Sequence, residues 1–482
     1  MLLFVLILFF ILWLIRTLKD VLFWVYLWQL KEYHIKRFID HFRTYKGKEL
    51  LLDKKRIIKA FLFIIFFVNP FVALILLSIA YILECMKMIS DFKNKKLLKP
   101  VFTGKTIAVI SMVLSLEIIF ILGTFLILEE KIWLLLIIDI LTPIIVFWAI
   151  LAFMPITNFF IKKKLSEAKK KLEKFENLTV IGVAGSYGKT STKEFLYDIL
   201  SAKYNVLKTK KNINAEIGIA KTILEELDEN HNILIAEIGA YEKGKIKEVC
   251  EIVKPDIGVL TGINEQHMAT FGSQKNIDEA KHEITEYSKI SFEKNKLNLR
   301  PTDIRTEKEY IYFKINSVDF KVNVLGIHNL ENIMLAVSVA QKLGMSLEEI
   351  SQACLKIKPT GMKIIRERPI VIDSSYSANP TGVIADLDYL NTYSGKKIVV
   401  MPCLIELGTS STEVHKKIAQ KIAQVCDLAI ITSRDCFDII KKEFPRAIYS
   451  NNPEKIIKKI KEFDVVLLEG RIPEQIKNVN TN

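Results

Sequence analysis

The sequence predicts an N-terminal helical membrane domain followed by α/β domains, and two observations lead to this prediction. Long apolar runs dominate residues 1–161, whereas residues 162–482 combine charged residues with strand-like and helix-like segments. In the second part, a strand-like segment, a glycine-rich turn and a helix-like segment follow one another, which is typical of α/β domains that bind phosphate groups. The length of 482 residues leaves room for about three domains, and the apolar runs exclude a wholly soluble protein.

Four apolar segments define the predicted membrane domain. About 20 apolar residues suffice to cross the hydrocarbon core of a bilayer. Ala60–Leu83 contains no charged residue, and Ile107–Leu128 and Ile132–Ile161 form a pair of long runs separated by a short turn. Met1–Ile15 is also apolar, and because no basic residue precedes it, we do not expect a cleaved signal peptide.

The distribution of lysine and arginine predicts the orientation of this domain. Residues 31–56 contain nine of them, residues 83–106 six and residues 161–174 seven, whereas the turn at residues 129–131 contains one. Basic segments stay on the cytoplasmic side of a membrane. We therefore expect a multi-pass protein of the cell membrane, with these three segments and the catalytic domains in the cytoplasm and the short turn outside.

Both ends of the Ala60–Leu83 run would then lie inside. Asn69 and Pro70 stand at its middle, where proline breaks a helix. We therefore expect a re-entrant hairpin at residues 60–83, with three complete spans and an outside N-terminus. The alternative is a plain four-span domain, which would place the segment with nine basic residues outside.

Two acidic residues lie inside the predicted spans, and a basic stretch follows them. Glu117 and Asp139 would be costly in hydrocarbon without a polar partner. They indicate either hydrogen bonding between helices or a polar groove for a lipid substrate. Leu165–Phe175 is lysine-rich and amphipathic, and we expect it to form a surface helix that joins the membrane domain to the rest.

The overall charge indicates the partner that the chain binds, and the cysteines indicate the redox compartment. Much of the net charge of +14 lies beside the apolar runs, and no basic stripe interleaved with aromatic residues indicates nucleic acid, so membrane lipid is the expected partner of these charges. The cysteines form no CxxC pair, which predicts reduced thiols in a cytosolic compartment rather than disulfides or zinc ligands. They are Cys85, Cys250, Cys354, Cys403, Cys426 and Cys436.

A phosphate-binding loop is predicted directly after the first strand of the soluble part. The β-branched run Leu178–Ala184 predicts a buried strand, and Thr192–Ser201 predicts a helix. Between them, Lys189 would contact the β- and γ-phosphates and the Thr190 hydroxyl would bind Mg²⁺. The standard motif has a glycine where this chain has Val183, but the strand and helix stand in the right order. The sequence therefore predicts ATP binding by Gly185, Ser186, Tyr187, Gly188, Lys189, Thr190 and Ser191.

Gly185–Ser191 resembles the short phosphate loop of the Mur ligases, the ATP-dependent amide-forming enzymes of cell-wall precursor assembly. Further segments within residues 178–472 resemble motifs of that family in the family's order. They are Asn212–Gly218, Ala236–Ala240, Asn264–Ser273, Ala280–Ile284, Gly326–Asn332, Ser374–Pro380 and Glu406–Gly408. Glu237–Ala240 and Tyr376–Pro380 are most similar to the branch of the family that adds the terminal dipeptide.

The resemblance implies roles for individual residues. Glu237 would bind Mg²⁺, His267 would bind a second Mg²⁺, and Lys281 would be carbamylated and join the metal site. Together with Lys189, His267 and Lys281 would then be catalytic. The residues implied on the nucleotide side are Asn329, Asn332, Lys363 and Asp373, and those implied for the substrate are Asn212, Asn214, Tyr376 and Asn379.

Each implied role has a plain structural alternative. Glu237 would otherwise be a surface acid, His267 a loop histidine with satisfied hydrogen bonds, and Lys281 a solvated helix lysine. The asparagines at 329 and 332 would cap a helix, and those at 212 and 214 would serve a turn.

Two positions depart from the family pattern. The family has an arginine after the glycine that opens the last domain, and here Gly361 is followed by Met362 and Lys363. An aspartate precedes the family's Ser-Tyr pair, and here Ser374 fills that place, with Asp373 one residue earlier. Lys363 and Asp373 would substitute after a small shift; otherwise handling of the γ-phosphate would be weakened.

The sequence divides into four parts: a membrane domain at 1–161, an amphipathic linker at 162–177, a central ATP-binding domain at 178–358 and a C-terminal ligase domain at 359–482. The resemblance implies a P-loop ATPase fold for the central domain and a Rossmann-like α/β fold for the last. There, an alternation of strands and helices predicts a parallel sheet. The strands are expected at Pro369–Asp373, Lys397–Met401, Leu428–Thr432 and Val465–Leu468, and the helices at Pro380–Thr392, Thr412–Val425 and Pro453–Glu462.

The resemblance implies an amide ligase that activates a substrate carboxylate as an acyl phosphate for attack by an amino acid or dipeptide. Family members begin with a soluble domain that holds a UDP group, whereas this chain has a membrane domain there. We therefore expect a cell-wall peptide precursor presented at the membrane and linked to lipid. The alternatives are a ligase of another polymer, of the pseudomurein or poly-γ-glutamate type, and a membrane scaffold that binds ATP without ligating.

Overall fold

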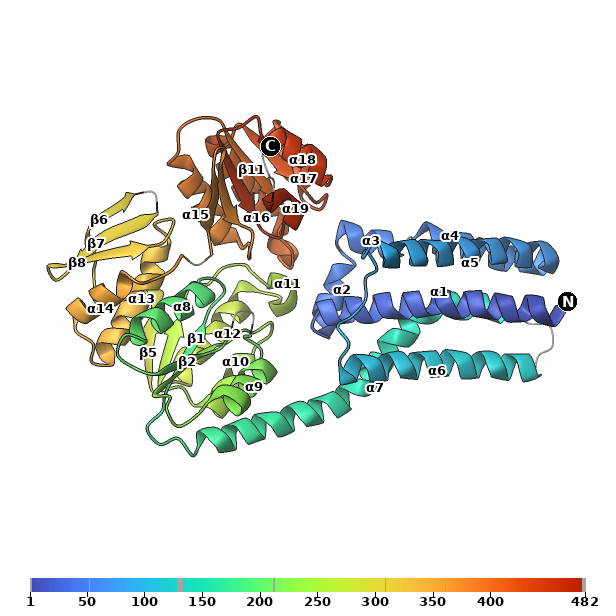
Figure 1. The fold of residues 1–482 in the computed structure, drawn as a ribbon, viewed down its shortest axis with the longest axis horizontal. Helices are drawn as coiled ribbons and strands as arrows, with labels where there is room; N and C mark the ends of the chain where they lie inside the picture. The colour runs from blue at the N-terminus through green and yellow to red at the C-terminus, as the bar shows by residue number, and fades with distance from the viewer. Residues whose placement is uncertain are drawn as a thin grey trace. The chain divides into compact units, whose positions relative to one another are not determined.

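A computed structural model of the chain describes residues 2–51, 53–127, 133–210, 213–307, 309–359 and 361–478. The chain forms two compact units, one at Met1–Ile161 and one at Lys162–Asn482 (Figure 1). The first unit is helical. The second contains three β-sheets with helices packed against them.

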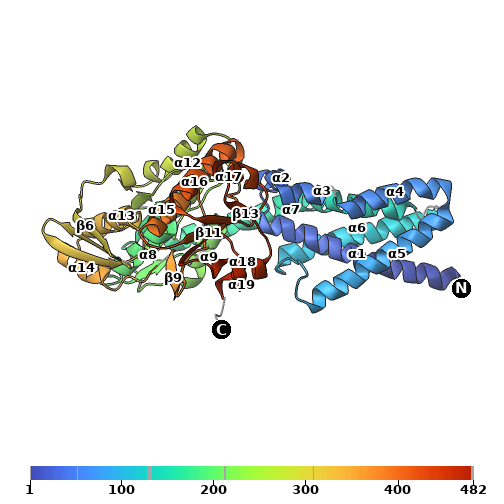
Figure 2. The same ribbon diagram turned by 90° about the horizontal axis from the view of Figure 1, so that it is seen from above.

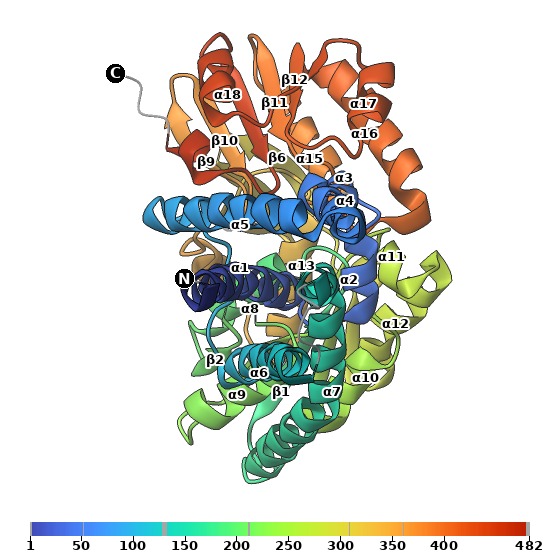
Figure 3. The same cartoon turned by 90° about the vertical axis from the view of Figure 1, so that its right-hand side faces the viewer.

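The first unit is a bundle built around its N-terminal helix. Its helices are α1 (Leu2–Leu30), α2 (Ile35–His41), α3 (Tyr45–Leu51), α4 (Lys54–Val68), α5 (Pro70–Lys93), α6 (Gly104–Ile127) and the first part of α7 (Trp133–Leu172). Viewed end on, α1 lies between α5 and α6 (Figure 3). Trp13 and Trp28 of α1 are fully buried, so α1 supplies the centre of the apolar core. The described part of the apolar run predicted at the N-terminus is therefore the beginning of a helix that continues to Leu30.

Three helices in the part of this unit that the structure describes are long and apolar enough to cross a membrane: Pro70–Lys93, Gly104–Gly123 and Trp133–Leu172. Asn69 separates α4 from α5, and its side chain accepts a hydrogen bond from Val72 N as the N-cap of α5. The two helices pack against each other as a hairpin (Figure 2). Because α5 has 24 residues, it extends about 36 Å at 1.5 Å per residue, which is long enough to cross the hydrocarbon core. The re-entrant hairpin at residues 60–83 stays a prediction. The acidic turn expected between α6 and α7 lies outside the described residues.

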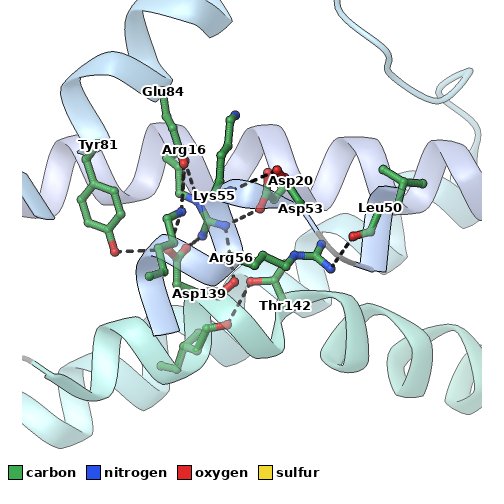
Figure 4. Close-up of polar contacts among 12 residues, drawn as sticks. Arg16, Asp20, Leu50, Asp53, Lys55, Arg56, Tyr81, Glu84, Asp139 and Thr142 are labelled. Carbon is green, nitrogen blue, oxygen red and sulfur yellow. Dashed lines mark hydrogen bonds and ion pairs between the residues drawn. The ribbon is translucent and has the colours of Figure 1, made fainter. Parts of the chain in front are cut away.

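Buried charges join four helices of the bundle (Figure 4). Asp139 of α7 pairs with Arg16 of α1, and its Oδ2 lies 2.7 Å from Lys59 Nζ of α4. Lys59 Nζ also lies 3.1 Å from a carboxylate oxygen of Glu84 in α5. The Tyr81 hydroxyl donates a hydrogen bond of 3.4 Å to Asp139 Oδ2. Asp139 therefore has its partners on neighbouring helices, which is the interhelical alternative rather than an open polar groove.

Helix α7 continues without interruption from the apolar run into the second unit. The lysine-rich stretch expected at Leu165–Phe175 as a separate surface helix is the last part of α7, which ends at Leu172. No helix-breaking residue lies between the apolar run and the lysines, because Pro143 and Pro155 both lie within the apolar part. The connection between the units is thus a helix and not a loop.

The first large sheet of the second unit is parallel throughout. It contains β1 (Thr179–Ala184), β2 (Val206–Lys208), β3 (Ile233–Glu237), β4 (Ile257–Leu260) and β5 (Ile290–Glu293) in the order β2-β3-β1-β4-β5. The connecting helices are α8 (Lys189–Leu200), α9 (Glu216–Glu226), α10 (Lys245–Val253), α11 (Met268–Phe271) and α12 (Gln274–Glu286). Since parallel strands end at one edge, the segments after β1 and β3 lie side by side, and Val183 pairs in register with Glu237.

A small antiparallel sheet packs on the α8 side of this domain. It contains β6 (Thr302–Glu307), β7 (Tyr310–Ile315) and β8 (Val318–Asn323). With α13 (Asn329–Lys342) and α14 (Leu347–Cys354) it shares an apolar core with α8, to which Phe195, Phe313 and Leu335 contribute. Helix α13 therefore runs beside α8, which brings its first residues to the phosphate loop.

The last part of the chain forms a six-stranded sheet in the order β13-β12-β11-β14-β10-β9. The four strands and three helices predicted there are confirmed as β10 (Ile370–Ser374), β11 (Lys397–Met401), β12 (Leu428–Ile431), β14 (Val465–Glu469), α15 (Pro380–Asn391), α16 (Ser411–Val425) and α18 (Pro453–Ile460). The prediction missed β9 (Lys363–Glu367), which is antiparallel to β10, and the short elements β13 (Ala447–Tyr449), α17 (Phe437–Glu443) and α19 (Glu474–Lys477).

The prediction that all cysteines are reduced is wrong for one pair. Cys403 and Cys436 form a disulfide, whereas the other four cysteines are free and buried. The two partners are 33 residues apart, and only folding of the last domain brings them together. Sequence spacing therefore carried no signal of this bond.

Candidate functional site

The phosphate loop connects the end of β1 to the start of α8. Gly185 and Gly188 have positive φ angles of 148° and 81°. A Cβ at Gly185 would lie 2.1 Å from Thr261 Oγ1, so a side chain there would clash with the neighbouring segment. The glycines thus let the backbone turn tightly into a helix N-terminus, where N–H groups favour anions.

Lys189, the first residue of α8, folds back over this loop. Its Nζ donates hydrogen bonds to Gly185 O at 2.7 Å and to Ser186 O at 3.1 Å. Burial lowers the pKa of Lys189, and the nearby Glu237 carboxylate opposes this shift. A half-buried lysine over a glycine-rich loop fits the phosphate groups of a nucleotide.

Two residues of the loop have a structural task. The backbone N–H groups of Ser186 and Tyr187 donate to Gly262 O at 2.7 and 3.2 Å. The Tyr187 ring covers Gly262, where a Cβ would lie 1.9 Å from Tyr187 Cζ, and Lys294 Nζ donates to the Tyr187 hydroxyl at 3.2 Å. Since these N–H groups are used, the donors left for phosphate are those at the Gly188–Ser191 end of the loop.

Glu237 ends β3 beside the loop and is 2% exposed. The Thr190 hydroxyl lies 3.1 Å from both of its carboxylate oxygens. Asn214 Nδ2 lies 3.5 Å from Glu237 Oε1, and the Glu237 backbone N–H donates to Thr209 Oγ1 at 3.0 Å. A hydroxyl and a buried carboxylate side by side are a suitable donor set for Mg²⁺, and Glu237 is not a surface acid. Asn212 lies outside the described residues.

Lys281 and His267 lie near the same loop. Lys281 is 1% exposed, and its Nζ donates to Ala240 O at 3.1 Å. Burial, together with the charge of Lys189, lowers the pKa of Lys281 to about 7. A solvated helix lysine is therefore excluded, and a neutral amine that can react with CO₂ is available near pH 7.

His267 connects the central domain to the C-terminal domain. Its Nδ1 lies 2.8 Å from Glu406 Oε2, and the edge of its ring faces Tyr241. Burial lowers the pKa of His267, whereas hydrogen bonding to Glu406 raises it. Glu406 has a positive φ of 63°. Its backbone carbonyl accepts a hydrogen bond from Ala269 N, so both the backbone and the side chain of Glu406 join the C-terminal domain to the segment around His267.

The asparagines predicted on the nucleotide side lie in the first turn of α13. Asn329 Nδ2 donates to Leu325 O at 2.8 Å, and Asn332 Nδ2 lies 3.4 Å from Asn329 Oδ1. Asn332 Oδ1 is buried and accepts no hydrogen bond from the described residues, and a Cβ at Gly188 would lie 2.6 Å from it. Both side chains are inside the helix turn rather than at its N-cap, which is His328. A buried acceptor without a donor beside the phosphate loop fits a polar ligand.

The C-terminal domain brings Tyr376 and Asn379 to the site. Burial and the Glu237 carboxylate raise the pKa of Tyr376, whereas its contact with the Thr190 hydroxyl lowers it. Asn379 Oδ1 accepts a hydrogen bond of 2.9 Å from Asn264 Nδ2 and also caps α15. Tyr376 thus contacts Thr190 of the proposed metal ligands from the last domain, as Glu406 contacts His267.

The residues at the two departures from the family pattern have contacts of their own. Lys363 is exposed at the start of β9 and pairs in register with Asp373. Asp373 Oδ1 accepts a hydrogen bond from Ser375 N, and the Ser374 hydroxyl donates to Asp386. In the part of the chain that the structure describes, no hydrogen bond or ion pair joins Lys363 or Asp373 to the phosphate loop. Their role towards the nucleotide stays a prediction.

Two residues of the cluster were not assigned from sequence. Lys193 is fully buried, and its Nζ lies 3.2 Å from Glu237 Oε2. It stands three residues after Thr190, a spacing that places both on one face of α8, so helical periodicity could have identified it. Glu406 lies 139 residues from His267, and this contact needed the fold.

A phosphate loop, a hydroxyl–carboxylate pair and a second α/β domain that reaches the same edge are typical of α/β proteins that bind phosphate groups. Residues 183–290 match the model of the Mur ligase middle domain, and residues 362–472 match that of the Mur ligase, glutamate ligase domain. The chain therefore carries the middle and C-terminal domains of the Mur ligase family.

Relatives with ligase names match about half of the chain. A UDP-N-acetylmuramoyl-tripeptide--D-alanyl-D-alanine ligase from Bacillus subtilis is 30% identical over 269 residues, which cover 49% of this chain and 59% of the relative. The Escherichia coli enzyme of the same name is 26% identical over 277 residues, covering 50% and 61%. The chain thus spans about three fifths of the length of these relatives.

Solved structures extend the similarity to the fold. The MurF structure from Acinetobacter baumannii has a TM-score of 0.60 at 25% identity and covers 64% of this chain and 77% of its own. MurF from Thermotoga maritima in complex with ADP has a TM-score of 0.59 at 26% identity, covering 66% and 83%. These similarities confirm the predicted Mur-ligase-like architecture of the soluble part.

Proposed function

We propose that this chain is a membrane-anchored, ATP-dependent amide ligase of the MurF type. The observation that carries the proposal is the contact of Thr190 with the buried Glu237 beside Lys189 and the phosphate loop, within a region that matches a Mur ligase domain. The fold of the MurF complex with ADP supports a nucleotide as the ligand of that loop. The relatives' names support amide formation as the reaction.

The proposed reaction has two steps. A carboxylate oxygen of the acyl substrate attacks the terminal phosphorus of ATP, the bond from that phosphorus to the bridging oxygen breaks, and ADP leaves. The amine nitrogen then attacks the acyl carbon and loses a proton, while inorganic phosphate leaves and an amide forms. Both steps depend on positioning and on neutralising phosphate charge. Lys189 supplies positive charge at the loop, and its place in the first turn of α8 keeps that charge next to the transferred group.

We propose that Mg²⁺ is held by Thr190 and Glu237, and a second ion by His267 and a carbamylated Lys281. When bound, the ions neutralise charge on the phosphate oxygens. The donor set fits, because Glu237 offers buried carboxylate oxygens and Lys281 has a pKa of about 7, which permits carbamate formation. Tyr376, Asn214 and Asn379 would border the acyl and amine substrates, as would Asn212.

The substrates are proposed by similarity. The relatives are named for joining UDP-N-acetylmuramoyl-tripeptide to D-alanyl-D-alanine, and we propose a D-alanyl-D-alanine-like dipeptide as the amine. We further propose that the acyl donor is a cell-wall peptide precursor presented at the membrane, because residues 1–161 form apolar helices where the family has a UDP-binding domain. The protein would lie in the cell membrane with its ligase domains in the cytoplasm.

The test uses the full-length protein in detergent or vesicles. It compares soluble UDP-linked tripeptide with lipid-linked tripeptide as donor, with D-alanyl-D-alanine as amine, and follows ADP release and product mass. Amine-dependent turnover that Lys189→Ala abolishes supports the ligase, and a preference for the lipid-linked donor supports presentation at the membrane. A preference for the soluble donor would defeat the second point alone.

The second candidate is a membrane scaffold that binds ATP without ligating. Ser374, engaged with Asp386, and the exposed Lys363 favour it. ADP binding without amine-dependent turnover, across a panel of amino acids, dipeptides and γ-glutamyl acceptors, would support this scaffold. Turnover with a γ-glutamyl or pseudomurein-type substrate would instead assign a ligase of another polymer.

A further inference from the structure

Lys193 is a buried lysine that the proposed reaction does not use. Its side chain is 0% exposed, and burying an ammonium group is costly unless a negative charge accompanies it. Its Nζ lies 3.2 Å from Glu237 Oε2 and 3.4 Å from Glu194 Oε1. Two carboxylates from different elements therefore hold the ammonium group in place.

The two oxygens of the Glu237 carboxylate have different nitrogen partners. Lys193 contacts Oε2, whereas Asn214 Nδ2 lies near Oε1. Thr190, three residues before Lys193 on the same face of α8, contacts both oxygens. Helix α8 thus holds the carboxylate from one side and leaves Oε1 directed towards the segment that contains Asn214.

A second ion pair extends this arrangement to the neighbouring strand. Glu194 also pairs with Lys208, the last residue of β2. The next residue, Thr209, accepts the hydrogen bond from the Glu237 backbone N–H. Lys193 therefore connects α8, β3 and the end of β2, which leads into the segment predicted to contact substrate.

We propose that Lys193 is a positioning residue for the cation site: it fixes Glu237 through Oε2, so that Oε1 can bind a divalent cation beside Thr190. This inference rests on the proposed function, since it takes Glu237 as a metal ligand. Lys193 itself contacts neither nucleotide nor metal in this account. It acts through the orientation of one carboxylate.

The test measures Mn²⁺ binding to full-length protein in detergent with saturating ADP, by the loss of the free Mn²⁺ electron paramagnetic resonance signal. This readout needs no ligation. We expect Lys193→Met to weaken Mn²⁺ binding about tenfold and Lys193→Gln, which keeps a hydrogen-bond donor, to weaken it less. The matched control is Lys203→Met, because Lys203 is a partly exposed lysine just after α8 that pairs with Glu349; it should leave binding unchanged.

A double variant separates positioning from general damage to the fold. If Lys193 acts through Glu237, Lys193→Met adds no further loss of Mn²⁺ binding to Glu237→Gln. Unchanged or tighter Mn²⁺ binding in Lys193→Met, or fully additive losses, would overturn the inference. If Lys193→Met does not fold, the comparison of Lys193→Gln with Glu237→Gln decides in the same way. If Glu237→Gln itself leaves Mn²⁺ binding unchanged, the proposed metal site fails instead.

Discussion

The Asp139 cluster of the first unit and two lysines of the second unit have different kinds of partner. In residues 1–161, Asp139 is surrounded by Arg16, Lys59 and Tyr81 from neighbouring helices. In the ligase unit, Lys189 and Lys281 donate to backbone carbonyl groups, and burial lowers the pKa of both. Paired charges hold helices together, whereas cations without a paired carboxylate retain the capacity to bind phosphate or to react. The comparison indicates a structural role for the first cluster and a chemical role for the second.

The largest effect is expected from breaking the Asp139 cluster. Asp139→Ala removes one of the two carboxylates that Arg16 and Lys59 share and leaves Glu84 as the other. Removing one member of a buried pair costs about 3–5 kcal/mol, and the remaining carboxylate reduces this cost. The thermal unfolding temperature of the protein in detergent should fall strongly. Thr157→Ala, a polar change on the same helix that removes only a local hydrogen bond to Met154 O, is the control. An unchanged unfolding temperature in Asp139→Ala would show that this cluster does not hold the bundle.

The second-largest effect is expected from breaking the disulfide, which lies in the second unit. The described residues of the first unit contain no disulfide. Reducing the Cys403–Cys436 disulfide releases a loop whose closure contributes about 3–4 kcal/mol in the chain-entropy model. Cys403→Ser should lower the unfolding temperature of the ligase unit and abolish its sensitivity to dithiothreitol. Cys354→Ser, a buried free cysteine, serves as the control for loss of a thiol. Equal unfolding temperatures with and without reductant in the unmodified protein would contradict this expectation.

Glu237→Gln should lower amine-dependent ADP release about a hundredfold, because a neutral amide cannot replace a carboxylate that stabilises phosphate charge through a cation. Steady-state turnover at saturating ATP measures the effect. Glu248→Gln, an exposed acid on α10 that pairs with Lys245, should retain full activity. Comparable losses of activity in both variants would contradict a specific role of Glu237 in the reaction.

The smallest effect is a pH dependence of about tenfold, set by Lys281. Only the neutral amine reacts with CO₂, and the pKa of Lys281 is about 7. Below pH 7 the ammonium form dominates, so carbamate formation should rise as the pH increases from 6 to 8 and then level off. The ¹³C NMR signal of protein exposed to ¹³CO₂ measures this. Lys281→Met should lack the signal, and a carbamate level that rises only near pH 10 would contradict a lowered pKa.

Local patterns account for what could be predicted from sequence. The phosphate loop, with Leu178–Ala184 before it and a helix after it, depends on adjacent residues, and so do the strands and helices of the last domain. Contacts between distant segments could not be predicted. Asp139 with Arg16, His267 with Glu406, and Cys403 with Cys436 join residues that only the tertiary fold brings together. Lys193 combines local and long-range information. Its position on the same helix face as Thr190 could be predicted from the sequence, whereas its burial could not.

The central claim is that the terminal phosphate held at residues 185–191 passes to a substrate carboxylate. Donor labelled with ¹⁸O in its carboxylate tests this claim directly, with mass spectrometry of the inorganic phosphate released during ligation. The account predicts one ¹⁸O atom in each phosphate, because the carboxylate oxygen that attacked phosphorus leaves with it. Phosphate free of ¹⁸O, formed alongside labelled amide product, would contradict the account.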